Sequence, residues 1–408
     1  MPNTLEGLHF SVDPITQKSS SSSTGKAIIS EALSLVNHHQ ARHVLKEKNW
    51  RKNYPLYFKC LVEHGICSTE QAINIAQQGL HKAQHSFDFY RQGQRYLLKD
   101  AMNISSIEKL QTIKVIGQSQ AAPEWYVPYK GKELRGQALL DQLDTWQRKG
   151  IIEPSHAEAM KRVHSHPEWL DLSQRSMVLF GAGSEAGPLS WLAKWKANII
   201  AIDLPNAQVW ERILNIVQQG NATLYAPSLE VIADDAPIEQ LKQALGANLL
   251  THIPEIAHWL VNNPHQLDLA AIAYLDGEKH VRVSMAMDSI MSYVSQQKPD
   301  SSLMYMCTPT DVYAVPQQTI EAAQQKYQQR SVLERVLSQG IATLSMKHLF
   351  QKSNPEVYSS DNAKSYGIAD CIVVEQGPNY ALAKRLQQWR ATLARHQGQQ
   401  VSINIAPS

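Results

Sequence analysis

Two patterns of hydrophobic and polar positions divide the chain near residue 172. Over residues 25–172, apolar side chains recur three and four positions apart, the spacing that gives a helix one apolar face. After Asp171, short β-rich runs alternate with longer segments of helical period, which is typical of strand–helix–strand units. The pattern predicts an α/β fold, with a doubly wound parallel sheet that follows an all-helical N-terminal domain.

The second region is expected to hold six strands. Apolar runs without polar alternation, such as Asn198–Ile202, are typical of strands that helices cover on both faces. The predicted strands are Met177–Gly181, Asn198–Asp203, Thr223–Ala226, Leu269–Leu275, Ser302–Thr308 and Val401–Ile405. The helices predicted between them include Leu189–Lys196, Gln208–Gln218, His280–Gln297 and Tyr380–Arg395.

The expected domain organisation has three parts. A serine-rich run at residues 19–24 predicts a flexible leader over residues 1–24. The helical domain then covers residues 25–172 and the α/β domain residues 173–408. A long interval between the fifth strand and the last helix indicates an insertion at about 312–372, with a Gln-rich helix at Thr319–Gln329.

Composition and charge exclude several classes of protein. The 39 basic and 37 acidic side chains nearly balance, and no basic stretch indicates a dedicated nucleic-acid binder. No run approaches the ~20 apolar residues of a membrane-spanning helix. Four cysteines without a CxxC spacing and the absence of a secretory signal favour a cytoplasmic protein. No HExxH motif is present, and no metal site is predicted.

A glycine-rich turn follows the first predicted strand. Gly181, Gly183, Ser184 and Gly187 lie between that strand and the next helix, where missing Cβ atoms let a pyrophosphate approach the backbone. Asp203 ends the second strand, where a carboxylate binds the ribose hydroxyls of adenosine and repels a 2′-phosphate. Strand, turn, helix and acid together predict a Rossmann-type site for NAD(H) in preference to NADP(H).

A tyrosine and a lysine lie one turn apart near the start of the last predicted helix. Tyr380 and Lys384 share a face because they are four residues apart. A neighbouring ammonium favours phenolate and so lowers the pKa of the tyrosine, and the same ammonium can hold a nicotinamide ribose. Because such pairs are common in helices, this spacing alone is weak support for a catalytic role.

In chain order, these motifs resemble the short-chain dehydrogenase/reductase superfamily over about residues 176–408. The resemblance implies that Tyr380 is the general acid/base for hydride transfer between NAD(H) and a small-molecule carbonyl or alcohol, with Lys384 on the ribose. It also implies that Asn248 faces the adenine. Thr308 or Thr310, after the fifth strand, is then the hydroxyl that polarises the substrate oxygen.

The sequence departs from the family pattern in ways that leave alternatives open. The turn reads GxGxxxG, and the family's asparagine in the fourth helix has no clear counterpart, Ser284 being nearest. A catalytically altered NAD-binding scaffold or sensor is one alternative. An S-adenosylmethionine-dependent methyltransferase is another, because such enzymes also use a glycine turn and an acid after the second strand. Self-association through the N-terminal helices also stays open.

Overall fold

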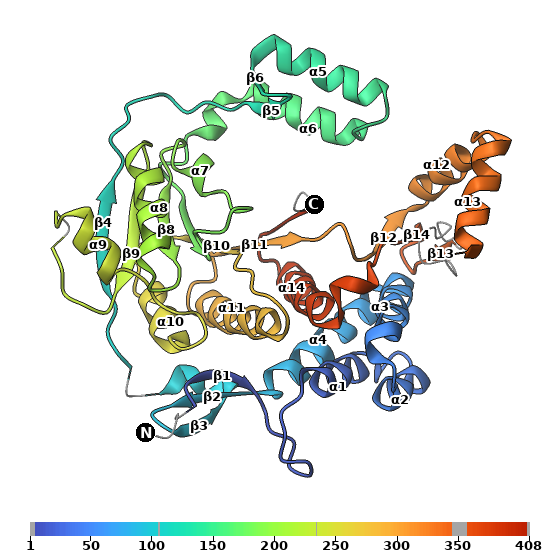
Figure 1. The fold of residues 1–408 in the computed structure, drawn as a ribbon, viewed down its shortest axis with the longest axis horizontal. Helices are drawn as coiled ribbons and strands as arrows, with labels where there is room; N and C mark the ends of the chain where they lie inside the picture. Colours follow the sequence, from blue (N-terminus) through green and yellow to red (C-terminus); the bar gives the residue numbers. More distant parts are fainter. Residues whose placement is uncertain (1–4, 105–106, 234, 345–356, 406–408) are drawn as a thin grey trace. The chain divides into compact units, whose positions relative to one another are not determined.

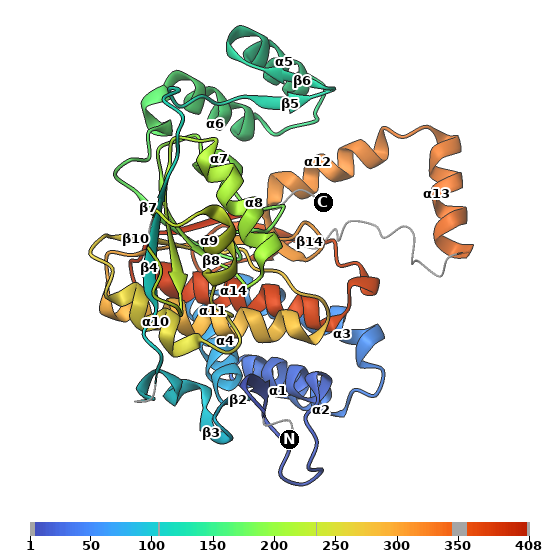
Figure 2. The ribbon, with the colours of Figure 1, turned by 60° about the vertical axis from the view of Figure 1, so that its left-hand side comes forward.

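The chain forms two compact units, each assembled from separated stretches of sequence (Figures 1 and 2). The structure is a computed structural model that describes residues 5–104, 107–233, 235–344 and 357–405. Unit 1 comprises Met1–Asn103, Tyr274–Ser289 and Tyr305–Ser408, and unit 2 comprises Ile104–Ala273 and Ile290–Met304. The units therefore do not divide at residue 172, where the sequence pattern changes.

Unit 2 is built on parallel strands. β7 (Ser176–Phe180) pairs in parallel with β8 (Asn198–Ile202) and with β10 (Leu267–Ala271), and β8 pairs in parallel with β9 (Thr223–Ser228). β4 (Gln111–Ile116) runs antiparallel to β9. Nearly every side chain of β7, β8 and β10 is buried, which explains why these strands lack polar alternation.

The main sheet has seven strands and is mostly parallel. Its order is β15-β11-β10-β7-β8-β9-β4, where β11 is Ser302–Cys307 and β15 is Val401–Ile405. The predicted α/β class and all six predicted strands are confirmed. The largest difference in bounds is at β10, which ends at Ala271 although the prediction continued to Leu275. The Leu275 amide faces the imidazole of His280, so the chain has already left the sheet.

Helices connect the strands of unit 2. The predicted helix Leu189–Lys196 is reduced to one turn. Beyond Leu192, the amides of Lys194 and Trp195 bond carbonyls three residues back, which is turn geometry rather than α-helical geometry. The helices within this unit are α5 (Gly136–Arg148), α6 (Pro154–Ser165), η2 (Pro167–Leu170), α7 (Leu189–Leu192), α8 (Ala207–Gln218), α9 (Ile238–Ala244) and α10 (Ile253–Val261). A short hairpin, β5 (Val127–Tyr129) and β6 (Lys132–Leu134), precedes α5, and α11 (Glu278–Gln297) starts in unit 1 and ends in unit 2.

Unit 1 combines a helical cluster with two small antiparallel sheets. Its helices are α1 (Ser21–Leu33), α2 (His38–Lys46), α3 (Trp50–Cys67), α4 (Thr69–Gln84), η1 (Leu98–Asn103), α12 (Gln317–Gln328), α13 (Val332–Leu344), η3 (Val374–Gln376) and α14 (Pro378–His396). The sheets, in strand order, are β1 (Gly7–Phe10), β2 (Phe87–Arg91), β3 (Gln94–Leu97), and β12 (Val312–Pro316), β14 (Ser365–Asp370), β13 (Tyr358–Ser359).

The N-terminal region differs from the predicted leader and all-helical domain. Residues 7–10 form a strand paired with β2, and the serine run enters α1, where Ser20 caps the amide of Ser23. Residues 25–172 contain β2–β6 as well as helices, and β4 belongs to the main sheet. The expected insertion contains β12, β13 and β14 together with α12 and α13, although residues 345–356 lie outside the described ones. Its predicted Gln-rich helix is α12.

Gly79 allows α4 to pack closely on α14. A Cβ built on Gly79 would lie only 2.3 Å from a ring carbon of Trp389, which is almost fully buried. The glycine therefore provides space for an aromatic ring that belongs to the core of unit 1.

Among the described residues, no helix is long and apolar enough to cross a bilayer.

Replacing Gly79 with alanine is expected to lower the free energy of unfolding by about 1–3 kcal/mol, because the new methyl group overpacks the Trp389 ring. Gly65→Ala is the matched control, since a Cβ there meets only Ala72 at 3.9 Å. Removing that helical glycine should stabilise the protein by about 0.5–1 kcal/mol. Urea denaturation measures both changes, and two variants of equal stability would contradict the packing argument.

Candidate functional site

The glycine turn after β7 is closed by the carboxylate of Asp203. The amide of Gly183 donates to Asp203 Oδ2 at 2.8 Å, and the amide of Leu204 donates to Asp203 Oδ1 at 2.8 Å. From α8, the guanidinium of Arg212 donates to the carbonyl of Gly183. The structure thus brings the predicted Gly183 and Asp203 into direct contact. It adds Arg212, a cation that sequence reasoning missed because only the packing of α8 places it there.

The loop that carries Asn248 lies beside Asp203. The amide of Ala247 donates to the carbonyl of Asp203 at 2.9 Å. Asn248 Oδ1 accepts from the amide of Leu250 at 2.9 Å, which orders the loop locally. The loops after β7, β8 and β9 therefore meet within unit 2, at the carboxyl ends of parallel strands. Ligands of open α/β sheets bind at such an edge.

Two glycines of this turn are required by contacts within the protein. Gly181 has a φ of +85°, and a Cβ on it would lie 2.6 Å from Ala273 Cα. A Cβ on Gly183 would lie 2.8 Å from Val209 Cγ1. Internal packing alone accounts for glycine at both positions, so neither glycine is by itself a sign of a bound phosphate.

The later part of the turn does not lead into a helix long enough for its dipole to hold a phosphate. Ser184 donates its amide to Gly181 O at 3.0 Å, and Gly187 donates to Ser184 O at 3.0 Å, so two tight turns follow each other. The helix after them, α7, has four residues. One helical turn has little macrodipole, and a pyrophosphate here would depend on Arg212 and on any turn amide that is not already donated within the protein.

Tyr380 and Lys384 lie near the start of α14, within a cluster of aromatic rings in unit 1. The ammonium of Lys384 is 5.9 Å from the centre of the Tyr380 ring and donates to the carbonyl of Met306 at 2.8 Å. His280 of α11 stacks on Tyr380, with ring centres 5.5 Å apart and planes at 21°. Tyr274 packs edge-on against Tyr380 at 6.1 Å. The predicted pair thus has two aromatic neighbours that its sequence spacing did not indicate.

His280 is a buried, uncharged member of this cluster. Its side chain is 1% exposed, and burial, reinforced by the charge of Lys384, lowers the pKa of the imidazole to about 3. Burial likewise lowers the pKa of the Lys384 ammonium, an effect that Cys307 opposes. His280 Nε2 is buried, and no described residue forms a hydrogen bond with it. A lone histidine carries no sequence signal for such a role, because only the fold places the start of α11 against α14.

Acidification is expected to destabilise the protein through His280. The unfolded chain protonates this imidazole near pH 6.5 and the folded chain only near pH 3, so the unfolded state binds the extra proton between these values. The free energy of unfolding should therefore fall by about 2–3 kcal/mol from pH 7 to pH 4.5 on account of this group. Urea denaturation of wild type and His280→Gln at both pH values measures it. If the free energy of unfolding fell equally in the two proteins, the effect could not be attributed to His280.

Thr308 and Thr310 follow β11, as predicted, and bind each other. Their hydroxyl oxygens are 2.8 Å apart, and Thr310 Oγ1 is 2.6 Å from Gln376 Oε1. Gln376 Nε2 donates in turn to the carbonyl of Thr310 at 2.8 Å. The two hydroxyls are therefore part of a closed side-chain network that joins the loop between β11 and β12 to η3.

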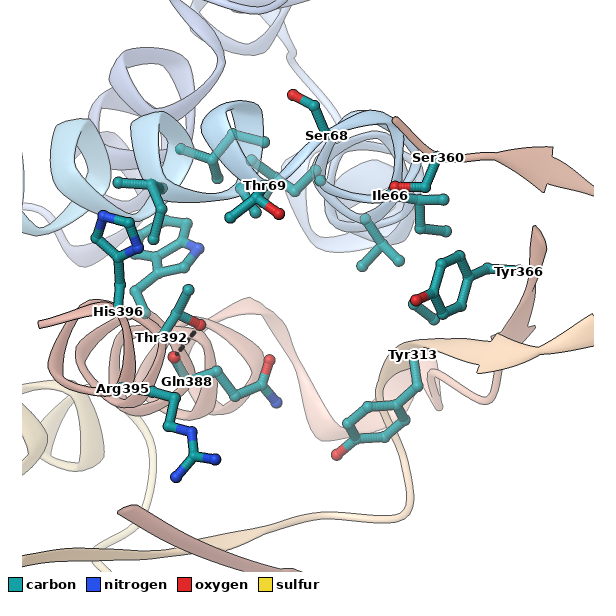
Figure 3. A pocket seen from close by; sticks show the side chains of 18 of the residues that line it. Ile66, Ser68, Thr69, Tyr313, Ser360, Tyr366, Gln388, Thr392, Arg395 and His396 are labelled. Atoms are coloured by element: carbon teal, nitrogen blue, oxygen red, sulfur yellow. Dashed lines mark hydrogen bonds between the residues drawn. The ribbon is translucent and has the colours of Figure 1, made fainter. Parts of the chain in front are cut away.

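A pocket of about 500 Å³ lies elsewhere in unit 1, among α3, α4, β12 and α14 (Figure 3). Beneath it, Arg385 Nη2 and Gln388 Nε2 each donate at 2.9 Å to the buried carboxylate of Asp311. Neither Tyr380 nor Lys384 lines this pocket. The pocket is bordered on one side by α14, with Gln388, Thr392, Arg395 and His396. Its other borders include Ser68 and Thr69 at the start of α4, and Tyr313 and Tyr366 of the β12–β14 sheet.

The described residues show no evident metal-binding site. Among them, no group of three or more His, Cys, Asp or Glu side chains is placed to hold a metal ion. Two histidine pairs at i, i+4 do occur, His39–His43 on α2 and His81–His85 near the end of α4, and their rings pack on each other at 4.5 and 4.4 Å.

Comparison with known proteins adds no relative. Protein-family models, curated proteins and solved structures all give no match to this chain. The resemblance to short-chain dehydrogenases/reductases therefore stays a prediction that rests on the motifs, and any function must be argued from the residues described above.

Proposed function

We propose that the chain is an NAD(H)-dependent oxidoreductase of the short-chain dehydrogenase/reductase type, acting on a carbonyl/alcohol pair. The main support is the order of the strands in the main sheet. If β7, β8, β9, β10, β11 and β15 are numbered one to six along the chain, their order in the sheet is 3-2-1-4-5-6. Doubly wound dinucleotide-binding sheets have this order. The helix that carries Tyr380 and Lys384 directly precedes the sixth strand, as the resemblance requires.

The residues at the end of β8 fit the adenosine half of such a cofactor. A half-buried carboxylate, Asp203, lies on the glycine turn with the Ala247–Asn248 loop beside it. A carboxylate at this position accepts hydrogen bonds from ribose hydroxyls. The guanidinium of Arg212 would hold the pyrophosphate, since α7 is too short to do so. Turn amides could contribute only where they are not already donated within the protein, as those of Gly183, Ser184 and Gly187 are.

In this proposal, the Tyr380 hydroxyl transfers the proton to or from the substrate oxygen. The nicotinamide, when bound, supplies or accepts the hydride. Lys384 keeps a positive charge beside the Tyr380 ring, and the Met306 carbonyl holds its ammonium in place. His280 stays neutral at working pH, so the cluster has one cation beside the tyrosine rather than two. This arrangement supports general acid/base chemistry by a phenol.

Cofactor preference tests the proposal. We expect the full chain to bind NADH more tightly than NADPH, because the Asp203 carboxylate repels a 2′-phosphate. Asp203→Ser should weaken NADH binding about tenfold and reverse the preference, since a lost bidentate charge-assisted contact is worth ~1.5–3 kcal/mol and Arg212 remains to attract the phosphate. Titration of cofactor fluorescence measures both affinities. Failure of the wild-type chain to bind either dinucleotide would overturn the proposal.

One observation favours an S-adenosylmethionine-dependent methyltransferase as a second candidate. Such a cofactor has an adenosine but no pyrophosphate, and the turn after β7 leads into a helix of only four residues. Thermal unfolding with NADH and with S-adenosylmethionine separates the two, because a ligand at 100 times its dissociation constant stabilises the folded state by about 2.7 kcal/mol. Stabilisation by S-adenosylmethionine alone would favour the second candidate.

A further inference from the structure

The threonine hydroxyls expected at the substrate have no proton to offer it. Gln376 donates its amide N–H to the carbonyl of Thr310, so its Oε1 faces the Thr310 hydroxyl and can only accept. The Thr310 proton therefore goes to Gln376. Thr308 Oγ1, 2.8 Å from Thr310 Oγ1, must then be the donor of that bond. Each hydroxyl carries one proton, and both protons are used within this network of Thr308, Thr310 and Gln376.

His280 holds an unused proton in the same unit. Its Nδ1 faces the amide of Leu275 at 3.5 Å, and a nitrogen that accepts from an amide is the unprotonated one of a neutral imidazole. The proton is therefore on Nε2, which is buried and has no acceptor among the residues that the structure describes. An unpaired buried N–H costs folding free energy, and a ligand that accepts from it would recover this cost.

The His280 N–H also lies in a suitable position, close to the proposed acid/base. The His280 ring stacks on the ring of Tyr380, the proposed acid/base. The ring centres of Tyr274 and His280 are 4.7 Å apart, and Tyr274 is 55% exposed, so a ligand that approaches the imidazole from this exposed side must displace the Tyr274 ring. A neutral N–H beside a phenol is suited to an uncharged oxygen.

We propose that the Nε2–H of His280 donates a hydrogen bond to the substrate oxygen on which Tyr380 acts, the task that the family resemblance gives to a hydroxyl after the fifth strand. The substrate class is then a neutral carbonyl or alcohol that reaches the cluster past Tyr274. This inference rests on the proposed function and adds to it the group that polarises the substrate.

The test uses full-length protein saturated with NADH and benzamide as the probe, since an amide carbonyl accepts a hydrogen bond and is not reduced by NADH. Benzamide should shift the ¹⁵Nε2 resonance of His280 in protein labelled at histidine. His280→Phe keeps a ring but no donor and should weaken benzamide binding about tenfold or more, whereas His280→Gln keeps an N–H and should stay within about threefold of wild type.

The outcomes separate this inference from the proposed function. If NADH binds but benzamide binds His280→Phe as well as wild type, or binds neither protein, the role of His280 is wrong and the cofactor proposal stands. An Nδ1–H tautomer in the labelled protein also overturns it. If NADH does not bind, both proposals fail. If benzamide binding is lost in His280→Phe but kept in His280→Gln, the result supports a hydrogen-bond donor at Nε2 over a purely structural role of the ring.

Discussion

Tyr380→Phe is expected to lower turnover roughly a thousandfold while NADH binds as in wild type. General acid/base catalysis by a positioned side chain contributes typically 10²–10⁴-fold, and the substitution removes only the hydroxyl. The phenylalanine ring can still stack on His280, so the cluster should keep its packing. Loss of NADH absorbance with a ketone or aldehyde found by screening wild-type protein measures turnover, and cofactor fluorescence measures binding.

Tyr274→Phe is the matched control for this experiment. Tyr274 belongs to the same aromatic cluster, but its hydroxyl donates to Asp276 Oδ1 at 3.1 Å. Removal of the Tyr274 hydroxyl should change turnover only slightly. A Tyr380→Phe protein that reacts at the wild-type rate would remove Tyr380 from the mechanism. Wild-type protein that binds NADH yet reduces no carbonyl in the screen would favour the scaffold or sensor alternative.

The second large effect is expected at a buried ion pair between α11 and α14. Arg390 Nε and Nη2 bind the two carboxylate oxygens of Asp288 at 2.6 and 2.9 Å. Burial opposes the charge of Arg390, but the attraction of Asp288 outweighs it, and the pKa of the guanidinium is raised. Asp288→Asn should lower the free energy of unfolding by about 3–5 kcal/mol, because it leaves a buried cation without its anion.

Urea denaturation tests this prediction against two controls. The double variant Asp288→Leu/Arg390→Met removes both charges and should stay within about 2 kcal/mol of wild type, since apolar pairs often replace buried ion pairs at little cost. Lys161→Ala breaks the more exposed pair with Asp144 and should cost less than about 1 kcal/mol. If Asp288→Asn lowered the free energy of unfolding no more than Lys161→Ala does, the Asp288–Arg390 pair would contribute little to stability.

The main sheet could be predicted largely because its strands are buried on both faces. Such strands appear as continuous apolar runs, as in β7 and β8, and their ends are marked by the glycine turn and by Asp203. β4 was missed, although Ile113 and Val115 are buried and alternate with exposed neighbours. That period of two is a readable strand signal, but it lies within a region whose helices dominate the pattern.

The candidate site could be predicted only where its residues are neighbours along the chain. The spacing of Tyr380 and Lys384 follows from helix geometry, and the acid after β8 follows from strand length. Arg212, Gln376 and His280 come from elements whose contacts depend on tertiary packing. The threonine prediction shows the same limit, because a hydroxyl at the right position says nothing about where its proton goes.

The segmented composition of unit 1 has a consequence for biosynthesis. Helices α1 and α4 pack on α14, which leaves the ribosome only after the whole of unit 2. Until then, the apolar faces of the N-terminal helices lack their native partner, and such faces are prone to aggregate or to recruit chaperones. Translation that stops before α14 should therefore yield an insoluble or chaperone-bound product rather than a folded N-terminal fragment.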